Sequence, residues 1–272
     1  MAELQYAAAS DLGFADPELY VNEDFVFIKE FNTDEGVVVL GIVADGAGSN
    51  GQTKFQPAAL ATIQIVESIE RLCQTNVADF LSCPQVFLQE AMVSASYTLG
   101  AFRMADPQRY SGFATSLSCI CIYNNNFAFA HTGITRIHLI RSSKKEAGKY
   151  DVLQLTRDQT KGMDEVDNGR LSFNEYHLHP SRLEVTGGLG TTVTPRIQTF
   201  AGQLKLNDFV LITSDGIHDA LRPDVMFELL KRSRDCDEAV KTLIVAAKTE
   251  QYQDNMAAAL FWYGASGNEA SK

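Results

Sequence analysis

The chain has few of the features that would place it in a membrane or on nucleic acid. No apolar run approaches the roughly 20 residues that a membrane-spanning helix needs. Basic residues are outnumbered by acidic ones, 23 to 34, which gives a formal net charge of −11. Because nucleic acid is bound through lysine and arginine on its phosphates, this balance argues against it. We expect neither a membrane nor a nucleic acid as partner.

Cysteine is scarce and shows no pairing pattern. The five cysteines are an odd number without a Cys-x-x-Cys pair, so their spacing supports neither a disulfide framework nor a zinc site. Such cysteines are more consistent with a reducing compartment than with an oxidising one. The first ten residues lack a basic region followed by an apolar core, so we expect no signal peptide. These features predict a soluble, cytoplasmic protein.

Internal repeats, low-complexity tracts and interdomain linkers are also missing. The 272 residues, 45% of them hydrophobic, are enough for a substantial core. We expect one domain over residues 1–264 and a short tail at 265–272. The polar, glycine-containing stretch 157–188 is the least regular part of the chain. It predicts a mobile, flap-like surface excursion that contains a short helix.

Hydrophobic periodicity predicts an α+β fold. Helical spacing covers 57–73 and 84–104, each with proline in its first turn, and also 222–233 and 237–251. The order of the elements, with paired helices between groups of strands, favours antiparallel sheets over a repeating βαβ arrangement. Short apolar or alternating runs predict strands at 4–10, 24–31, 37–44, 115–123, 127–132, 136–141, 151–156, 196–202, 208–214 and 256–264.

Carboxylates recur where the predicted strands begin or end. Glu23 and Asp24 precede one strand, Asp45 and Asp215 each end one, and Asp254 precedes the last. An Asp-Gly pair after an apolar run usually indicates a tight hairpin, but here a loop or helix follows both pairs. Buried acids need a cation, and no run of lysine or arginine lies beside these motifs. Hard ions such as Mg²⁺ and Mn²⁺ take oxygen ligands, so the acids predict a divalent metal site.

A series of short motifs runs through the chain in a fixed order. They read SDLG (10–13), NED (22–24), VADGAG (43–48), FATSLSCICI (113–122), AHTGITRIHLI (130–140), LQLTRDQT (153–160), SDGIHDAL (214–221) and QDN (253–255). Together they resemble the type-2C, metal-dependent protein phosphatase (PPM) family over nearly the whole chain. The resemblance implies an αββα four-layer sandwich, in which two central antiparallel sheets lie between helical pairs. It also implies a dinuclear Mg²⁺ or Mn²⁺ site.

The resemblance implies a role for each acid at the predicted strand ends. Asp45 would bridge the two ions, with the Gly46 carbonyl on one of them, and Asp215 and Asp254 would hold the other. Metal-activated water would then attack phosphorus in line, so no nucleophilic side chain is needed. The absence of an obvious cysteine or serine nucleophile motif agrees with this mechanism.

Three further acids have outer roles by the same resemblance. Glu23 and Asp24 would act on the ions partly through bound waters. Asp158, together with Asp215, would correspond to the looser third metal site of bacterial members. Asn255 is expected to orient the loop of the preceding aspartate and not to bind metal.

The chain departs from the family pattern near the expected phosphate. Leu19 stands where the family often has an arginine that grips the substrate phosphate through two hydrogen bonds. The acid of the family's Gly-Asp-Ser-Arg turn is Ile134, and the histidine of its Leu-Thr-x-Asp-His-Ser segment is Gln159. Phosphate would be held by the metals alone, or by a cation such as Arg157 or Lys54.

Structural roles stay open for several of these residues. The acids could be turn formers at strand ends, and Asp158 a solvated loop acid. The histidines are expected to be structural or on the surface, with His177 and His179 alone able to reach a substrate.

The sequence thus predicts one catalytic domain that removes phosphate from phosphoserine and phosphothreonine in proteins. It would use two Mn²⁺ or Mg²⁺ ions per active site, with a third in the bacterial manner. Its partner would be a phosphorylated protein, the target of a serine/threonine kinase. Two alternatives remain: a pseudophosphatase that binds or regulates, which Leu19 and Ile134 favour, and a hydrolase of small phosphoesters. The 157–188 segment is our hypothesis for substrate choice.

Overall fold

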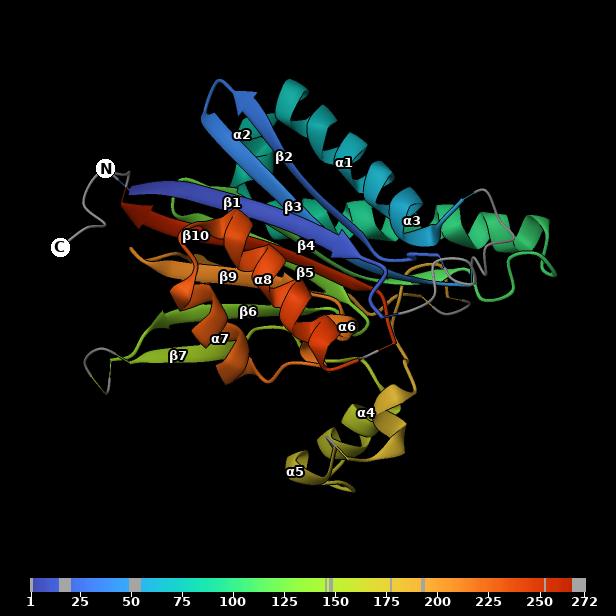
Figure 1. The fold of residues 1–272 in the computed structure, drawn as a ribbon. Coiled ribbons are helices and arrows are strands. Elements are labelled where there is room, and N and C mark those ends of the chain that lie inside the picture. Colours follow the sequence, from blue (N-terminus) through green and yellow to red (C-terminus); the bar gives the residue numbers. More distant parts are fainter. Residues whose placement is uncertain are drawn as a thin grey trace.

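Ten strands form two five-stranded antiparallel sheets in the computed structural model (Figure 1). The structure describes residues 2–14, 21–48, 55–144, 146, 149–176, 178–191, 194–251 and 253–265. Leu19, Lys54 and His177, which the sequence analysis singled out, lie outside the described residues. The expected tail begins at Ala265, and its other residues lie outside them as well.

The strand order separates the chain into two sheets that each combine distant segments. The first sheet has the order β1 (Ala2–Asp11), β10 (Met256–Ala265), β9 (Asp208–Thr213), β6 (Arg136–Ser142) and β7 (Tyr150–Gln154). The second has the order β2 (Phe25–Thr33), β3 (Gly36–Ala47), β4 (Ala114–Tyr123), β5 (Asn126–Thr132) and β8 (Gln198–Gln203). Every strand that the periodicity predicts is present, with ends that differ by at most a few residues.

Helices cover the outer face of each sheet (Figure 1). The second sheet is covered by α1 (Pro57–Thr75) and α3 (Pro84–Ala105), joined by the short α2 (Val77–Ser82). The first is covered by α6 (Asp215–His218), α7 (Pro223–Arg232) and α8 (Cys236–Thr249). The predicted α+β architecture, two antiparallel sheets between helical pairs, is confirmed. The short α2 was not predicted.

Three apolar layers hold the four structural layers together, and strand β10 shows how. Met256 and Leu260 pack toward α8, whereas Ala257 and Phe261 pack toward the second sheet. Successive side chains of a strand point to opposite faces, so both faces of β10 are buried. The strand therefore reads as a continuous apolar run and not as an alternating one.

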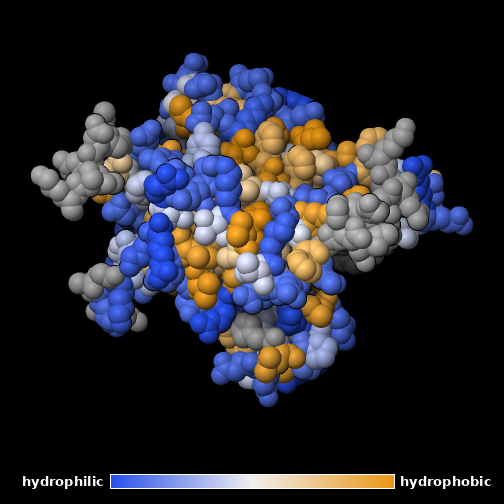
Figure 2. All heavy atoms as spheres, viewed as in Figure 1, coloured by the Kyte–Doolittle hydropathy of each residue, from blue (hydrophilic) through white to orange (hydrophobic). Residues whose placement is uncertain are grey.

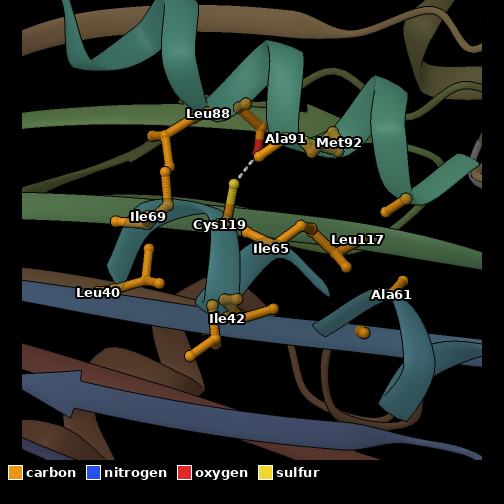
Figure 3. Close-up of a cluster of buried hydrophobic side chains, with 14 of the residues drawn as sticks. Leu40, Ile42, Ala61, Ile65, Ile69, Leu88, Ala91, Met92, Leu117 and Cys119 are labelled. Carbon is orange, nitrogen blue, oxygen red and sulfur yellow. Dashed lines mark hydrogen bonds between the residues drawn. The ribbon is translucent and has the colours of Figure 1, made fainter. Parts of the chain in front are cut away.

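The layer between the second sheet and its helices is formed by aliphatic side chains at helical spacing (Figure 3). Ile65 and Ile69 of α1 lie over Leu40, and all three are fully buried. The Cys119 thiol in this layer donates a hydrogen bond to the Ala130 carbonyl oxygen at 3.5 Å. Burial raises the pKa of Cys119 to about 12, so the thiol stays protonated and serves as a small core residue.

The predicted excursion folds as a compact unit, which we call the flap segment (residues 160–185). It contains α4 (Lys161–Asp167), α5 (Phe173–Tyr176) and the 3-10 helix η1 (Pro180–Leu183), in place of the single short helix that we expected. A bridge between Thr160 and Val185 closes its base. The flap segment stands below the sheets, and its surface mixes hydrophilic and hydrophobic residues (Figure 1, Figure 2). Its mobility stays a prediction.

No helix in the described parts of the chain is long and apolar enough to cross a lipid bilayer.

Candidate metal centre

Four aspartates converge at one end of the sandwich, two from each sheet. Asp24 precedes β2 and Asp45 lies near the end of β3, and these strands pair antiparallel with Phe25 opposite Ala44. Asp215 follows β9 and Asp254 precedes β10, which are likewise antiparallel neighbours. The start of one strand thus lies beside the end of its partner in both sheets. The topology therefore collects residues that are up to 230 positions apart in the sequence.

Strand alternation directs Asp45 toward the layer between the sheets. Val39 and Val43 of β3 belong to the core that separates the two sheets. Asp45 is two residues further along the same strand, so its side chain lies on the same face. The acid therefore stands at the open end of the inter-sheet core. The Thr115 hydroxyl of β4 donates to the Asp45 carbonyl oxygen at 2.8 Å and holds the strand end in place.

Hydrogen bonds join the two sheets at this end. The Ser214 hydroxyl, next to β9, donates to the Asp24 carboxylate and accepts from the Ala257 backbone N–H at 2.8 Å. The Asn255 side chain accepts from the Glu23 backbone N–H at 2.7 Å and donates to the Leu12 carbonyl at 3.1 Å. Asn255 thus orients the loop that carries the first pair of acids.

Two glycines permit close backbone contact on either side of Asp254. Gly13 has a φ of +81°, and a Cβ there would lie 1.9 Å from the Asp254 carbonyl oxygen. A Cβ on Gly216 would lie 1.9 Å from the carbonyl oxygen of Asn255. Any other residue at either position would force the neighbouring backbone to shift, because real Cβ atoms essentially never approach another atom so closely. These glycines belong to the SDLG and SDGIHDAL motifs and fix the position of the acid.

The pKa of each of the four aspartates is raised above its ordinary value. Burial is the largest cause for each, and neighbouring carboxylates add to it. Asp24 is raised by Asp215 and Asp254, and Asp45 is raised by Asp24 and Asp254. Among the described residues, the Oδ2 atom of Asp24 is buried without a hydrogen-bond partner. Of the four, Asp24 is buried, Asp45 and Asp215 are half-buried and Asp254 is exposed. A cation between these carboxylates would relieve their repulsion and the cost of burying them.

The donor set fits a hard divalent ion. Carboxylate and carbonyl oxygens are the ligands that Mg²⁺ and Mn²⁺ prefer, and the unpartnered Asp24 oxygen is such a ligand. Among the described residues, no three histidine, cysteine, aspartate or glutamate side chains lie in a group that could hold a metal ion. Mg²⁺ does not require three such side chains, because it keeps several waters and is usually held by one or two carboxylates.

Asp158 is held by an ion pair with Arg136. Its two oxygens accept from Arg136, at 3.0 and 2.6 Å, and one of them also accepts from the Tyr176 hydroxyl at 3.1 Å. Burial alone would raise the pKa of Asp158, but hydrogen bonds and charge from Arg136 hold it below the ordinary value. Asp158 is therefore part of a buried ion pair and not a solvated loop acid. Its expected role at a third ion stays a prediction.

Sequence reasoning missed a charged residue beside the centre and the arginine that pairs with it. Asp219 raises the pKa of Asp215 and of Asp254, and it forms an ion pair with Arg182 of the flap segment at 2.6 Å. The signal for Asp219 was present, since a residue four positions after Asp215 lies on the same side of a helical turn. Arg182 had no such signal, because only the tertiary fold brings η1 to α6.

Two of the positions that depart from the family pattern, Gln159 and Ile134, make hydrogen bonds that hold their turns. Gln159 accepts from the Thr132 hydroxyl at 3.0 Å and from the Gly133 N–H at 3.1 Å. The Ile134 N–H donates to the Ser116 hydroxyl oxygen at 3.2 Å, so the turn is kept without its acid. Arg157 pairs with an aspartate of α4 at the surface.

Three histidines are buried and neutral. Burial lowers the pKa of His131 and of His138 to about 4, and it also lowers the pKa of His218. His131 bonds the Ser118 hydroxyl and His218 the Thr213 hydroxyl, both at 2.9 Å. These contacts indicate structural roles, as the sequence suggested.

The fold and the acidic centre define a class of protein: a two-sheet sandwich with a carboxylate site at one end. No protein-family model matches the chain. By sequence it is 24% identical to a putative protein phosphatase 2C-type of Streptococcus pyogenes, over 88% of this chain and 90% of that protein. It is 25% identical to the serine/threonine protein phosphatase PstP of Mycobacterium tuberculosis over 90% of its own length, a match that spans 42% of PstP.

Solved structures show the same fold. The S. agalactiae serine/threonine phosphatase superposes with a TM-score of 0.78 at 23% identity, covering 96% of this chain and all of that one. The catalytic domain of PstP, solved with two manganese ions, gives a TM-score of 0.72 at 24% identity, with 97% of this chain and all of that one covered. The chain thus resembles bacterial type-2C (PPM) serine/threonine phosphatases in sequence and shares the fold of their solved structures.

Proposed function

We propose that the chain is a metal-dependent phosphoprotein phosphatase that hydrolyses phosphoserine and phosphothreonine. The observation that carries this proposal is the group of four aspartates, two from each sheet, that strand pairing brings to one end of the sandwich. Burial and neighbouring carboxylates raise the pKa of each. Such a group has a chemical purpose when cations bind between its members. The names of the relatives supply the substrate class, a phosphorylated protein.

Mn²⁺ or Mg²⁺ would be held by oxygen donors from both sheets. PstP was solved with two manganese ions, which supports a pair of ions here. When bound, the ions supply an acidified water for attack on phosphorus and neutralise charge on the phosphoryl oxygens. The residues that would hold them are Asp45, the Gly46 carbonyl, Asp215 and Asp254, with Glu23 and Asp24 at the entry of β2.

The chain's own groups prepare this site without taking part as nucleophiles. The Ser214 hydroxyl and the Asn255 amide fix the backbone and side chain next to Glu23 and Asp24. Burial raises the pKa of Cys73 and of Cys236 to about 11, so these thiols are protonated at neutral pH. Water-based hydrolysis agrees with both observations.

The test is hydrolysis of a small aryl phosphate and of a phosphopeptide with Mn²⁺, Mg²⁺ or a chelator. Asp45→Asn and Asp215→Asn should abolish metal-dependent turnover, while Asp167→Asn, an exposed acid of the flap segment, should leave it unchanged. Wild-type protein without turnover under any metal would favour the pseudophosphatase. A preference for the small ester over the peptide would favour the alternative hydrolase.

We also infer one catalytic domain over residues 1–264, because the three apolar layers are shared by elements from the whole chain. A cytoplasmic location is part of the proposal as well. The five cysteines are unpaired, and four of them are buried, which suits a compartment that keeps thiols reduced.

A further inference from the structure

A cavity of about 290 Å³ lies beside the turn between α7 and α8, over the first sheet (Figure 1). We call it the distal cavity. Its walls include Tyr150 of β7, Phe209 of β9, Phe227 of α7 and Trp262 of β10. Trp262 lies six residues beyond Met256, where β10 begins beside the acids, which is about 20 Å along the strand. The distal cavity is therefore separate from the acidic centre.

Four half-buried aromatic rings give the distal cavity its shape. Phe209 and Trp262 stack with 5.9 Å between ring centroids and 12° between ring planes, and Tyr150 and Phe227 lie 4.9 Å apart. None of the four rings is fully covered by the protein, so apolar surface remains for a ligand to cover. An apolar cavity of about 150 Å³ is enough for benzene. The distal cavity therefore fits a flat molecule of about two fused rings.

The charged groups at the rim of the distal cavity favour a negatively charged ligand. Lys231 lines the cavity, and its ammonium has no ion pair or hydrogen bond among the described residues. The two other charged side chains at the rim already have partners. Arg234 pairs with Glu238 at 3.0 Å, and the Asp235 carboxylate accepts from the Glu238 N–H at 2.8 Å. One cation is thus left to meet an anion.

The indole of Trp262 provides a second, independent indication of a ligand. Its Nε1–H is buried and has no hydrogen-bond partner in the described part of the chain. A buried donor without a partner is unfavourable, and a small rotation of the ring would bring this N–H to an oxygen atom in the distal cavity. An acceptor group on the ligand therefore suits this wall as well as the lysine.

We propose that the distal cavity binds a small aromatic carboxylate. The rings of the ligand would cover the four aromatic side chains, and its carboxylate would meet the Lys231 ammonium and accept from the Trp262 N–H. Hydrogen bonds to an ionised group are stronger than those between neutral groups. The inference is independent of the proposed function, because no metal ion and none of the four aspartates takes part in it.

The experiment uses the only tryptophan of the chain, Trp262, as the reporter. In the full chain labelled with the NMR-active nitrogen isotope, the indole N–H gives a single resonance that needs no assignment. Titration with 2-naphthoate should shift this resonance in a saturable way. Chelator is present throughout, so that no metal ion can bind the carboxylate. Calorimetry under the same conditions should give a Kd of about 1 mM or tighter, as expected for a ligand of this size.

Three variants separate the contacts. Lys231→Ala should weaken binding by about 2- to 5-fold, the range for an exposed charge contact. The matched control is Arg232→Ala, which removes the same charge one residue further along α7, outside the lining of the cavity, and should leave binding unchanged. Phe227→Leu keeps an apolar side chain but removes one ring, so it should weaken binding by about 3- to 10-fold.

Two further ligands test the chemical class. Uncharged 2-naphthamide lacks the carboxylate, and decanoate has a carboxylate without rings, so both should bind more weakly than 2-naphthoate. An indole resonance that does not move with 2-naphthoate would overturn the proposal. Equal losses in Lys231→Ala and Arg232→Ala, or tighter binding of decanoate than of 2-naphthoate, would overturn it as well.

Discussion

Gly13→Ala tests whether the position of Asp254 depends on a close contact with the loop after β1. Gly13 is buried, has a φ of +81°, and would place a Cβ 1.9 Å from the Asp254 carbonyl oxygen. Alanine therefore introduces two separate costs. One is backbone strain at a positive φ, and the other is displacement of the segment that carries the acid.

The magnitudes follow from this geometry. Real Cβ contacts are essentially never under 3.0 Å, so the Asp254 backbone must retreat by about 1.1 Å. A misplacement of about 1 Å can cost about 100-fold in rate, so we expect turnover with Mn²⁺ to fall by about that factor. Strain at positive φ costs about 1–2 kcal/mol, and crowding adds about 1–3 kcal/mol to the loss in unfolding free energy.

The matched control is Gly169→Ala. Gly169 follows α4 with a φ of +67°, and a Cβ there would meet nothing within 4 Å. This variant carries the strain without the displacement, so it should lose about 1–2 kcal/mol of stability and keep its metal affinity and turnover. Both variants should be measured by urea unfolding, by Mn²⁺ titration and by aryl phosphate hydrolysis. If Gly13→Ala matched Gly169→Ala in metal affinity and rate, the close contact would not position Asp254, and our reasoning about the centre would be refuted.

Three further perturbations have expected outcomes. The raised pKa values of the four aspartates mean that the metal-free fold is favoured below the ordinary 3.8 and loses stability as pH rises through the raised values. The gain in thermal midpoint with Mg²⁺ over chelator should therefore grow from about pH 5 to about pH 8; a constant gain would contradict this. Asp158→Ala leaves the buried Arg136 without its carboxylate partner. It should lower the unfolding free energy in urea by about 3–5 kcal/mol and leave metal affinity unchanged. His138→Leu removes two buried nitrogens that have no partner among the described residues, so it should raise the unfolding free energy by about 1 kcal/mol. The difference should widen as pH falls from 6.5 toward about 4, because the buried histidine resists protonation; equal pH profiles for the two proteins would rule this out.

The sequence predicted the strands because both faces of most of them are buried. Runs such as 37–44 have no polar interruption, and their length separates them from helices. The helix α2 was missed because six residues with only Phe80 buried carry too little periodicity to detect. The flap segment was recognised as irregular, but the order of its three short helices depends on contacts such as the Thr160 bridge to Val185.

The inner acids could be proposed from sequence because each sits beside a glycine or at a strand end within an ordered series of motifs. The ion pair of Asp158 could not be proposed in this way, because a motif match does not reveal that Arg136 donates to both of its carboxylate oxygens. Arg182 and Asp219 depend in the same way on packing between η1 and α6. Residues whose partners are distant in sequence are those for which pattern reasoning fails.

The acids at one end of the sandwich come from both sheets, and this affects how firmly the two sheets are held together. Most of the layer between the two sheets is filled by aliphatic and aromatic side chains. At the end near the acids, the layer is flanked by negatively charged side chains, two from each sheet. A cation bound between these acids would act as a removable crosslink between the two sheets. Chelation should then loosen this end first and leave the opposite end packed. In the metal-free protein, we therefore expect the least cohesive region at the proposed metal site, where ion occupancy would set how firmly the two sheets are held together.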